Sequence, residues 1–150
     1  MVAESKPFPH LAGATVAGGN YDTSRLAGKP FVLNVWATWC GPCAREQPAL
    51  RLLQQHYGVR VGFLGINYRD DASAAKAWLE QFGVTYPSLS DPSGRYAKDL
   101  GFPGLPDTYV VDATGTIRFA IFGETNGTQL GGLVDRLLVV QASATASATP

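Results

Sequence analysis

The sequence has little cysteine. Among its 150 residues there are two, Cys40 and Cys43. A wider disulfide framework is therefore excluded, and any disulfide must join these two residues or link one of them to another molecule. Histidine is equally scarce, because His10 and His56 are the only two and their spacing is unrelated to the cysteines. Zinc needs about four ligands, so a zinc site is a minor alternative and we predict no metal.

Long hydrophobic runs and an excess of one charge are also missing. No apolar run approaches the roughly 20 residues that span a membrane, and residues 1–6 lack the apolar segment of a signal peptide. Either the protein is cytosolic, or a leader or membrane anchor has been cut away. Twelve basic residues balance twelve acidic ones, and no basic stripe is visible. Nucleic acid is therefore not an expected partner.

The composition and the order of predicted elements indicate one α/β domain. Hydrophobic residues make up 45% of the chain and charged residues 16%, which is enough to build a buried core. An extended arm (1–12) and a hairpin (14–21) precede a helical turn (23–26). Then follow a strand (31–36), a helix (42–57), a strand (59–67), a helix that begins at Asp70 or Asp71, a short helix (91–100), two strands (108–112 and 116–122) and a last helix (128–140). The alternation predicts a central mixed β-sheet flanked by helices, with an N-terminal β-hairpin extension.

The domain is expected to span residues 1–140. Residues 141–150 have the low-complexity sequence Gln-Ala-Ser-Ala-Thr-Ala-Ser-Ala-Thr-Pro, which predicts a disordered tail.

The two cysteines lie between a predicted strand and a helix whose first turn contains Pro42. There the first sulfur meets the free N–H groups and the positive dipole end of the helix, which stabilise a thiolate and lower its pKa. Cys40 is therefore the predicted nucleophile, and Cys43, one turn inside the helix, the resolving thiol. A purely structural disulfide would close a very small loop and add little stability, so it is a minor alternative.

The stretch Asn-Val-Trp-Ala-Thr-Trp-Cys-Gly-Pro-Cys at residues 34–43, with Pro48 further along the helix, resembles the thioredoxin superfamily over roughly residues 8–138. Residues 65–71, 104–112 and 115–118 resemble its TlpA/ResA/DsbE (CcmG) branch more than thioredoxin itself. That branch carries Gly-x-Asn-Tyr-Lys-Asp and Gly-x-Pro-Glu-Thr-Phe at the first two places. Here Arg69, Asp107 and Tyr109 replace the Lys, Glu and Phe, and the shorter acid at 107 reaches less far.

The resemblance implies a thioredoxin-like fold and a thiol:disulfide oxidoreductase whose only cofactor is its redox-active Cys40–Cys43 disulfide. Such proteins act outside the cytoplasm, in the periplasm, in the cell envelope or as secreted proteins. They keep the haem-binding cysteines of apocytochrome c reduced, and a membrane protein of the DsbD/CcdA type reduces them in turn. A leader or membrane anchor would then be absent from this sequence, and we expect a monomer.

The resemblance also implies a substrate-binding surface beside the cysteines. In this family the proline that faces the active site is cis, and the matching residue is Pro106. Its family role is to hold the backbone of Leu105 where it can pair with a substrate peptide beside Cys40; the alternative is an ordinary turn before a strand. The other residues expected to contact substrate are Trp39, Gly41, Pro42, Tyr68 and Asp107. For Tyr68, a packing role is an equal alternative.

Acidic residues are candidates for moving the proton of the resolving thiol. Thioredoxin has a buried Asp six residues before its first active-site cysteine, where this chain has Asn34, which cannot take a proton. The branch places an acid after the second strand instead, and Asp70 matches it. Alternatively, Asp70 caps the next helix, although Asp71 can do so too. Asp107 is a second candidate acid. Three charged residues are predicted to be solvated on the helix or at the rim of the site, namely Arg45, Glu46 and Arg69.

Four hypotheses for function remain open. The leading one is a reductase in cytochrome c biogenesis or for related extracytoplasmic thiols, because thioredoxin, a strong reductant, has the same Gly-Pro between its cysteines. The second is an oxidase that introduces disulfides into secreted proteins. A peroxidase is disfavoured, because Leu33 and Ala37 replace the Pro and Thr of the peroxiredoxin motif. The last is a binding module without electron transfer.

Overall fold

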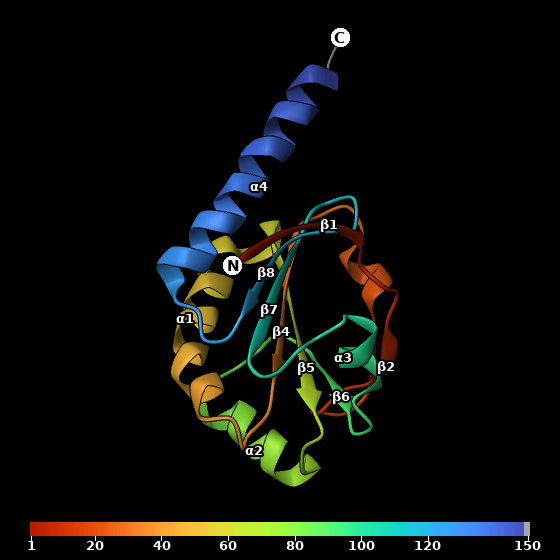
Figure 1. Ribbon diagram of the computed structural model, residues 1–150, viewed down its shortest axis with the longest axis vertical. Coiled ribbons are helices and arrows are strands. Elements are labelled where there is room, and N and C mark those ends of the chain that lie inside the picture. The colour runs from red at the N-terminus through yellow and green to blue at the C-terminus, as the bar shows by residue number, and fades with distance from the viewer. Residues whose placement is uncertain (149–150) are drawn as a thin grey trace.

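The computed structural model describes residues 1–148. Its main sheet has six strands in the order β1-β8-β7-β4-β5-β6 (Figure 1). The strands are β1 (Val2–Pro7), β4 (Phe31–Trp36), β5 (Gly62–Tyr68), β6 (Ser88–Asp91), β7 (Asp107–Val111) and β8 (Thr116–Phe122). Strands β4, β5 and β6 are parallel, whereas β7, β8 and β1 pair antiparallel in succession. The sheet is therefore mixed, as predicted.

In the part of the chain that the structure describes, four α-helices and a small hairpin surround this sheet. The helices are α1 (Gly41–Tyr57), α2 (Ala72–Gln81), α3 (Arg95–Asp99) and α4 (Gly127–Ala148). The predicted N-terminal hairpin is formed by β2 (Ala12–Ala14) and β3 (Asn20–Asp22), and the 3₁₀ turns are η1 (Thr23–Leu26) and η2 (Gly58–Arg60). Within residues 1–148, no helix combines the length and the hydrophobicity needed to cross a membrane.

Strand β4 is buried on both faces, which explains its continuous apolar sequence. Val32 packs with Leu50 of α1 and Leu130 of α4, on the face that these two helices cover (Figure 1). Leu33 points to the opposite face, where it joins Ala97 of α3. Helix layers on both sides therefore fix β4, and with it the position of the loop that follows.

Four predictions about the elements need correction. The arm over residues 1–12 contains an edge strand, β1, which pairs with β8. Strand β6 lies in a stretch where no strand was predicted, and β5 begins at Gly62, after the turn η2, rather than at residue 59. The helix α4 continues through Ala148, whereas the sequence predicted disorder from residue 141. Alanine favours helix strongly, and extending a formed helix avoids the cost of nucleation. Residues 149 and 150 of the predicted tail lie outside the described residues.

Candidate active site: the Cys40–Cys43 disulfide and its groove

The two cysteines lie where β4 gives way to α1, at the carboxyl end of the parallel strands (Figure 1). Cys40 is the N-cap residue of α1, with an extended backbone, and Cys43 lies in the first turn. The two form a disulfide, and the backbone N–H of Cys43 donates to Sγ of Cys40 at 3.3 Å. The predicted placement of the first sulfur at a helix N-terminus is confirmed.

The two sulfurs differ in access. Cys40 is 6% exposed and Cys43 only 1%. A substrate sulfur can therefore reach Cys40 from solvent, whereas Cys43 is shielded behind it. This asymmetry agrees with the predicted roles of nucleophile and resolving thiol.

A groove of about 450 Å³ opens beside Cys40. Its lining, which we call the redox groove, consists of Trp39, Cys40, Gly41, Pro42, Tyr68, Phe102, Pro103, Gly104 and Leu105. Five of the residues predicted to contact substrate are thus brought together around Cys40: Trp39, Gly41, Pro42, Tyr68 and Leu105. The sequence did not single out Phe102, Pro103 and Gly104. Among the described residues, none that lines this groove is charged.

Two features set the walls of the redox groove. The peptide bond between Leu105 and Pro106 is cis, as expected from the resemblance, and Pro106 itself is buried behind the lining. On the other wall, Trp39 is 61% exposed, and its indole Nε1 donates to the backbone carbonyl of Arg69 at 3.1 Å. A large exposed aromatic side chain held in place beside the nucleophile is a typical contact surface for a polypeptide.

Asp70 lies next to the site, but its carboxylate is fully engaged. It accepts hydrogen bonds from the backbone N–H and hydroxyl of Thr38 (both 2.7 Å), from Asn67 (2.9 Å) and from the N–H of Asp71 (2.9 Å). Partial burial opposes ionisation, but these hydrogen bonds outweigh it and lower the pKa of Asp70. The cap of α2 is Asp71, whose side chain accepts from the N–H of Ala74. Asp70 therefore ties the loop before Cys40 to the end of β5.

Two other acids are buried, and the side-chain amide of Asn34 donates to the carboxylate of one, Glu46, and to the backbone carbonyl of the other, Asp107. Asp107 is 1% exposed and does not line the redox groove, and burial raises its pKa to about 7. Glu46, predicted to be solvated, is 2% exposed, so that prediction is wrong. Burial raises its pKa to about 7 as well, although its carboxylate accepts from Asn34 (2.8 Å) and from the N–H of Thr125 (3.0 Å). The neighbouring Arg45 and Arg69 are exposed, as predicted.

The position of Glu46 relative to the cysteines follows from helix geometry. It lies three residues after Cys43 on α1, and residues with this spacing share one face of a helix. The same spacing is visible in the sequence, and it is the signal that could have identified Glu46. The site therefore combines an accessible sulfur, a shielded sulfur and two buried acids whose pKa values lie near neutrality.

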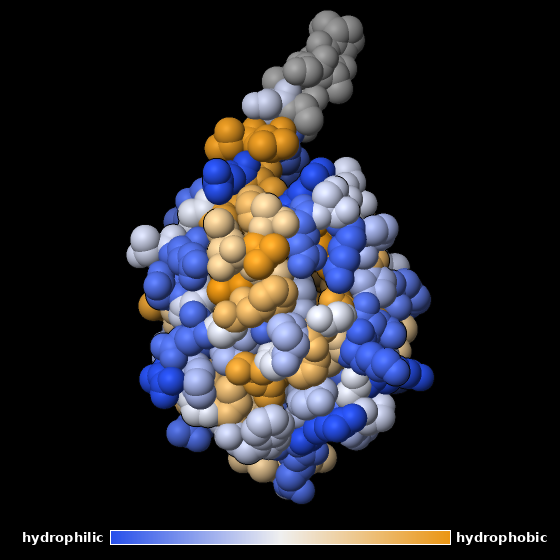
Figure 2. All heavy atoms as spheres, viewed as in Figure 1, coloured by the Kyte–Doolittle hydropathy of each residue, from blue (hydrophilic) through white to orange (hydrophobic). Residues whose placement is uncertain are grey.

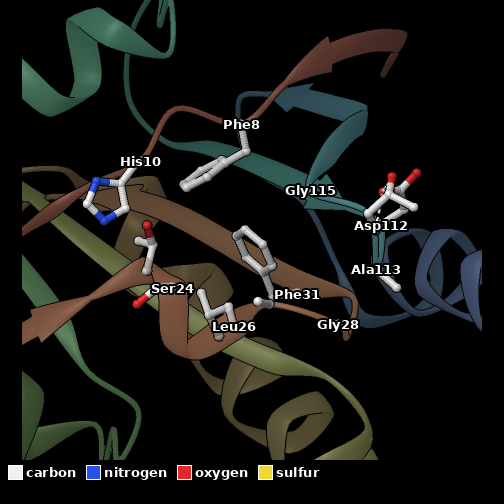
Figure 3. Close-up of a pocket in the computed structure, with 12 residues that line it drawn as sticks. Phe8, His10, Ser24, Leu26, Gly28, Phe31, Asp112, Ala113 and Gly115 are labelled. Atoms are coloured by element: carbon white, nitrogen blue, oxygen red, sulfur yellow. Dashed lines mark hydrogen bonds between the residues drawn. The ribbon is translucent and has the colours of Figure 1, made fainter.

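A separate pocket of about 230 Å³ lies at the other end of β4. Figure 3 shows Phe8 and Phe31 facing one another there, with His10 and Ser24 nearby. No cysteine lines it, and His10 bonds to Asp22 at 2.8 Å. Within the described part of the chain, no three His, Cys, Asp or Glu residues come together as a metal site would require. The candidate chemistry is therefore concentrated at Cys40 and Cys43.

Comparisons with known proteins agree with this site. Residues 3–135 match the family described as Redoxin. A protein named thiol:disulfide interchange protein DsbE, from Vibrio cholerae, is 39% identical over 127 residues, which cover 84% of this chain and 67% of the relative. The chain spans about two thirds of the length of such curated relatives.

Solved structures show the same fold. A DsbF homologue from Corynebacterium diphtheriae superimposes with a TM-score of 0.83 at 28% identity, covering 89% of this chain and 88% of that one. A secreted disulfide oxidoreductase from Mycobacterium tuberculosis, described as homologous to Escherichia coli DsbE, superimposes with a TM-score of 0.78 at 27% identity. It covers 85% of this chain and 96% of that one.

Proposed function

Because this chain belongs to the Redoxin family of thioredoxin-fold proteins, in its DsbE-like branch, we propose that its thiol:disulfide oxidoreductase activity reduces disulfides of extracytoplasmic proteins. The substrate class we favour is apocytochrome c, whose haem-binding cysteines must be reduced. The observation that carries the proposal is the uncharged redox groove beside the Cys40–Cys43 pair. Such a groove suits an extended polypeptide around a target cysteine, rather than a small charged thiol.

The reaction proceeds in two thiol–disulfide exchanges. In the reduced protein, the Cys40 thiolate attacks one sulfur of the substrate disulfide, and the other substrate sulfur leaves as a thiolate that takes up a proton. Cys43 then loses its proton and attacks Sγ of Cys40, so that the second substrate thiol is released and the Cys40–Cys43 disulfide forms. Two electrons pass from the protein to the substrate, and the dithiol of a membrane reductase of the DsbD/CcdA type returns them.

The second exchange needs an acceptor for the Cys43 proton, because the thiolate is the attacking form. Glu46 shares a helix face with Cys43, and Asp107 is buried on the other side of Asn34, whose amide donates to Glu46 and to the backbone carbonyl of Asp107. Both have pKa values near neutrality, which suits a group that takes a proton and gives it up again. Asp70, the acceptor suggested by sequence, has a lowered pKa and four donors already bound. We therefore assign proton transfer to the two buried acids and loop positioning to Asp70.

The helix N-terminus and the shielding of Cys43 favour attack by Cys40. They do not fix the direction of electron flow, which depends on the redox potential. We expect a potential close to that of thioredoxin, at roughly −270 mV, measured by equilibration of the Cys40–Cys43 pair with glutathione or dithiothreitol. A value near roughly −120 mV, as in DsbA, would contradict the reductase and favour the alternative function of an oxidase for secreted proteins.

The substrate is tested by trapping it. In a Cys43→Ser variant the mixed disulfide at Cys40 cannot be resolved, so proteins captured in cells of the source organism can be identified by mass spectrometry. We expect apocytochrome c among them, and Cys40→Ser as a control should capture none. Capture of secreted proteins without haem-binding cysteines would contradict the role in cytochrome c biogenesis while leaving the oxidoreductase activity intact.

A further inference from the structure

A second groove adjoins the redox groove and differs from it in charge. It encloses about 680 Å³ and shares Tyr68 and Phe102 with the redox groove. Its remaining lining residues are Arg69, Ser93, Gly94, Arg95, Lys98 and Gly101. We call these residues the cationic groove, because the lining carries three basic side chains and no acidic one. The rings of Tyr68 and Phe102, with centroids 4.7 Å apart, form the boundary between the two grooves.

The positive charges of the cationic groove are not neutralised within the described part of the chain. The ion pairs among the described residues are His10–Asp22, Arg45–Glu124 and Arg118–Asp112. None of them involves a residue of the cationic groove. Arg69 donates to the carbonyl of Ser93, and Arg95 donates to the hydroxyl of Tyr96. The neighbouring acid Asp91 is buried beneath α3, where it accepts from two backbone N–H groups. An anionic group that entered the groove would therefore meet unpaired cations.

Arg69 connects the two grooves physically. Its backbone has φ of 42°, in the left-handed region, and its N–H donates to the carbonyl of Asp91 at 3.0 Å. The carbonyl of Arg69 accepts from the indole of Trp39 in the redox groove. Its guanidinium lies 5.3 Å from the centre of the Tyr68 ring and lines the cationic groove. A non-glycine residue held in this conformation by several contacts is typical of a functional surface.

Gly94 makes room for this arrangement. A Cβ at this position would lie 2.8 Å from the Tyr68 ring and 2.9 Å from Nε of Arg69, closer than such atoms can approach. The absence of a side chain therefore lets the guanidinium and the ring come down onto the turn before α3. The cationic groove is thus a shaped part of the fold and not merely a group of surface cations.

We propose that the cationic groove binds an acidic side chain of the substrate polypeptide, near the cysteine that reacts with Cys40. The inference deepens the proposed function and rests on it. The redox groove has no charge with which to select among peptides, whereas the adjoining cations favour a segment that carries Asp or Glu. The shared aromatic rings let one extended peptide occupy both grooves. Rim charges of this kind chiefly set specificity and the association rate.

The test uses disulfide-cyclised peptides with two cysteines separated by two residues and with capped termini. At each of several positions on either side of the cysteines, a Glu peptide is compared with the matched Gln peptide. The second-order rate constant for reduction by the reduced protein is measured by quenching and chromatography. At one or more positions we expect the Glu peptide to react about three to ten times faster than the Gln peptide.

Variants of the cationic groove, a matched control variant and added salt locate the source of this preference. In Arg95→Gln/Lys98→Gln only Arg69 remains as a cation of the lining, so the Glu-to-Gln ratio should fall well below that of the unmodified protein. In Arg95→Glu/Lys98→Glu a Lys peptide should become the better substrate. The matched control Arg51→Gln/Lys76→Gln removes two exposed cations elsewhere and should keep the ratio of the unmodified protein. In the unmodified protein alone, about 0.5 M salt should also remove the preference, because exposed charges are then screened.

The outcomes separate this inference from the proposed function. If Glu and Gln peptides are reduced at equal rates at every position, the proposal that the cationic groove binds an acidic side chain is wrong. The proposed reductase activity would be unaffected. The same holds for a Glu-to-Gln ratio in Arg95→Gln/Lys98→Gln that equals the ratio of the unmodified protein at low salt. If no peptide of either kind is reduced, the result contradicts both the proposed function and the binding of an acidic side chain.

Discussion

At the scale of single residues, the unusual feature of the site is a pair of buried acids with pKa values near neutrality. Both Glu46 and Asp107 are almost fully buried, and burial raises the pKa of each to about 7. The charge of Asp107 also contributes to raising the pKa of Glu46, so a proton on Asp107 favours ionisation of Glu46. The two acids therefore have consequences for stability and for rate that can be measured separately.

Asp107 should make the protein less stable as the pH rises. Its pKa is about 7 in the folded state and 3.8 ordinarily, so the folded state binds the proton more tightly. The contribution of Asp107 to stability is therefore fully present below about pH 4 and lost as the pH rises through 7. In Asp107→Asn this loss disappears, so the variant should gain roughly 2–4 kcal/mol relative to the unmodified protein between about pH 4 and pH 8. Urea unfolding across this range measures the difference.

Asp112 supplies a control of opposite sign. Partial burial opposes its ionisation, but hydrogen bonds from Thr114, Thr116 and Arg118 outweigh it and lower its pKa. Its contribution to stability is present above its ordinary pKa and lost as the pH falls through the lowered value. Asp112→Asn should therefore be less stable than the unmodified protein at neutral pH, with a difference that shrinks in acid. Parallel pH profiles for the two variants would contradict the assignment.

Glu46 should control the release of substrate from the mixed disulfide. Glu46→Gln cannot accept the proton of Cys43, so resolution at neutral pH should slow by roughly tenfold to a hundredfold, toward the lower end of effects of general bases. The rate for the unmodified protein should rise with pH through an apparent pKa near 7, and this step should vanish in the variant. Stopped-flow decay of a preformed mixed disulfide at Cys40 measures it. The exposed Glu80→Gln is the control, and an unchanged profile in Glu46→Gln would exclude the role.

Residues next to each other in the motif were easier to predict than residues brought together by the fold. Cys40, Cys43 and Trp39 are contiguous, and the helix that follows them fixes their roles by local geometry. Glu46 was predicted to be solvated because its burial depends on Thr125, which lies 79 positions away in the sequence. The resemblance suggests Asp70 as a proton acceptor, whereas its engagement by Thr38, 32 positions away in the sequence, is settled only by the tertiary structure.

At the scale of elements, the same contrast separates the predicted strands from the missed ones. The strand at residues 31–36 matches β4 residue for residue, because all six of its side chains are buried. Strand β1 has the sequence Val-Ala-Glu-Ser-Lys-Pro, with most side chains exposed, so no alternation marks it. It is held by pairing with β8, more than a hundred residues later. Strand β6 is likewise polar and short, and its pairing with β5 defines it.

The turn before α3 offers a prediction at this scale. Gly94→Ala adds a Cβ against Tyr68 and Arg69 on a backbone with φ of 78°. Gly115→Ala is a matched control, because φ is 83° there but no atom lies within 4 Å of the added Cβ. Both variants should lose about 1 kcal/mol to the left-handed backbone, and Gly94→Ala should lose a further 1–2 kcal/mol, roughly, to crowding.

The Gly94→Ala variant should also displace Arg69 and Tyr68, and so weaken the preference for acidic peptides. Thermal unfolding gives the stability difference, and the Glu-to-Gln rate ratio gives the effect on the groove. Equal stabilities for Gly94→Ala and Gly115→Ala would contradict the close approach of Arg69 and Tyr68 to this turn.

At the scale of the whole molecule, the redox site lies at one end of the sheet, and the projecting part of helix α4 lies at the other. The carboxyl ends of β4 and β5 meet at the edge where α1 begins, an ordinary place for a site in an open α/β sheet (Figure 1). Helix α4 projects from the opposite end, and Figure 2 shows hydrophobic atoms on its projecting part. Val139 and Val140 there are 66% and 65% exposed. The redox site and the projecting part of α4 therefore lie at opposite ends of the molecule (Figure 1).

The edge strand β1 offers a prediction about the stability and association of the whole molecule. It covers β8, which would otherwise be the edge of the sheet, and an uncovered edge strand tends to pair with other molecules. Removing residues 1–5 leaves Lys6, whose Nζ donates to the carbonyl of Leu100 at 3.0 Å, and so preserves that support of the loop after α3. The truncated protein should unfold at a lower urea concentration and associate in light scattering.

The monomeric fraction of the truncated protein should reduce a neutral peptide at the original rate, because two strands, β8 and β7, lie between β1 and the strand β4 that leads to the cysteines. A synthetic peptide of residues 1–8 should restore the monomer, since the pairing of Val2 with Ala120 and of Ala3 with Phe119 would be available again. If the truncated protein stays monomeric and equally stable, β1 has no protective role. If it loses activity as a monomer, the sheet transmits changes from its edge to the redox site.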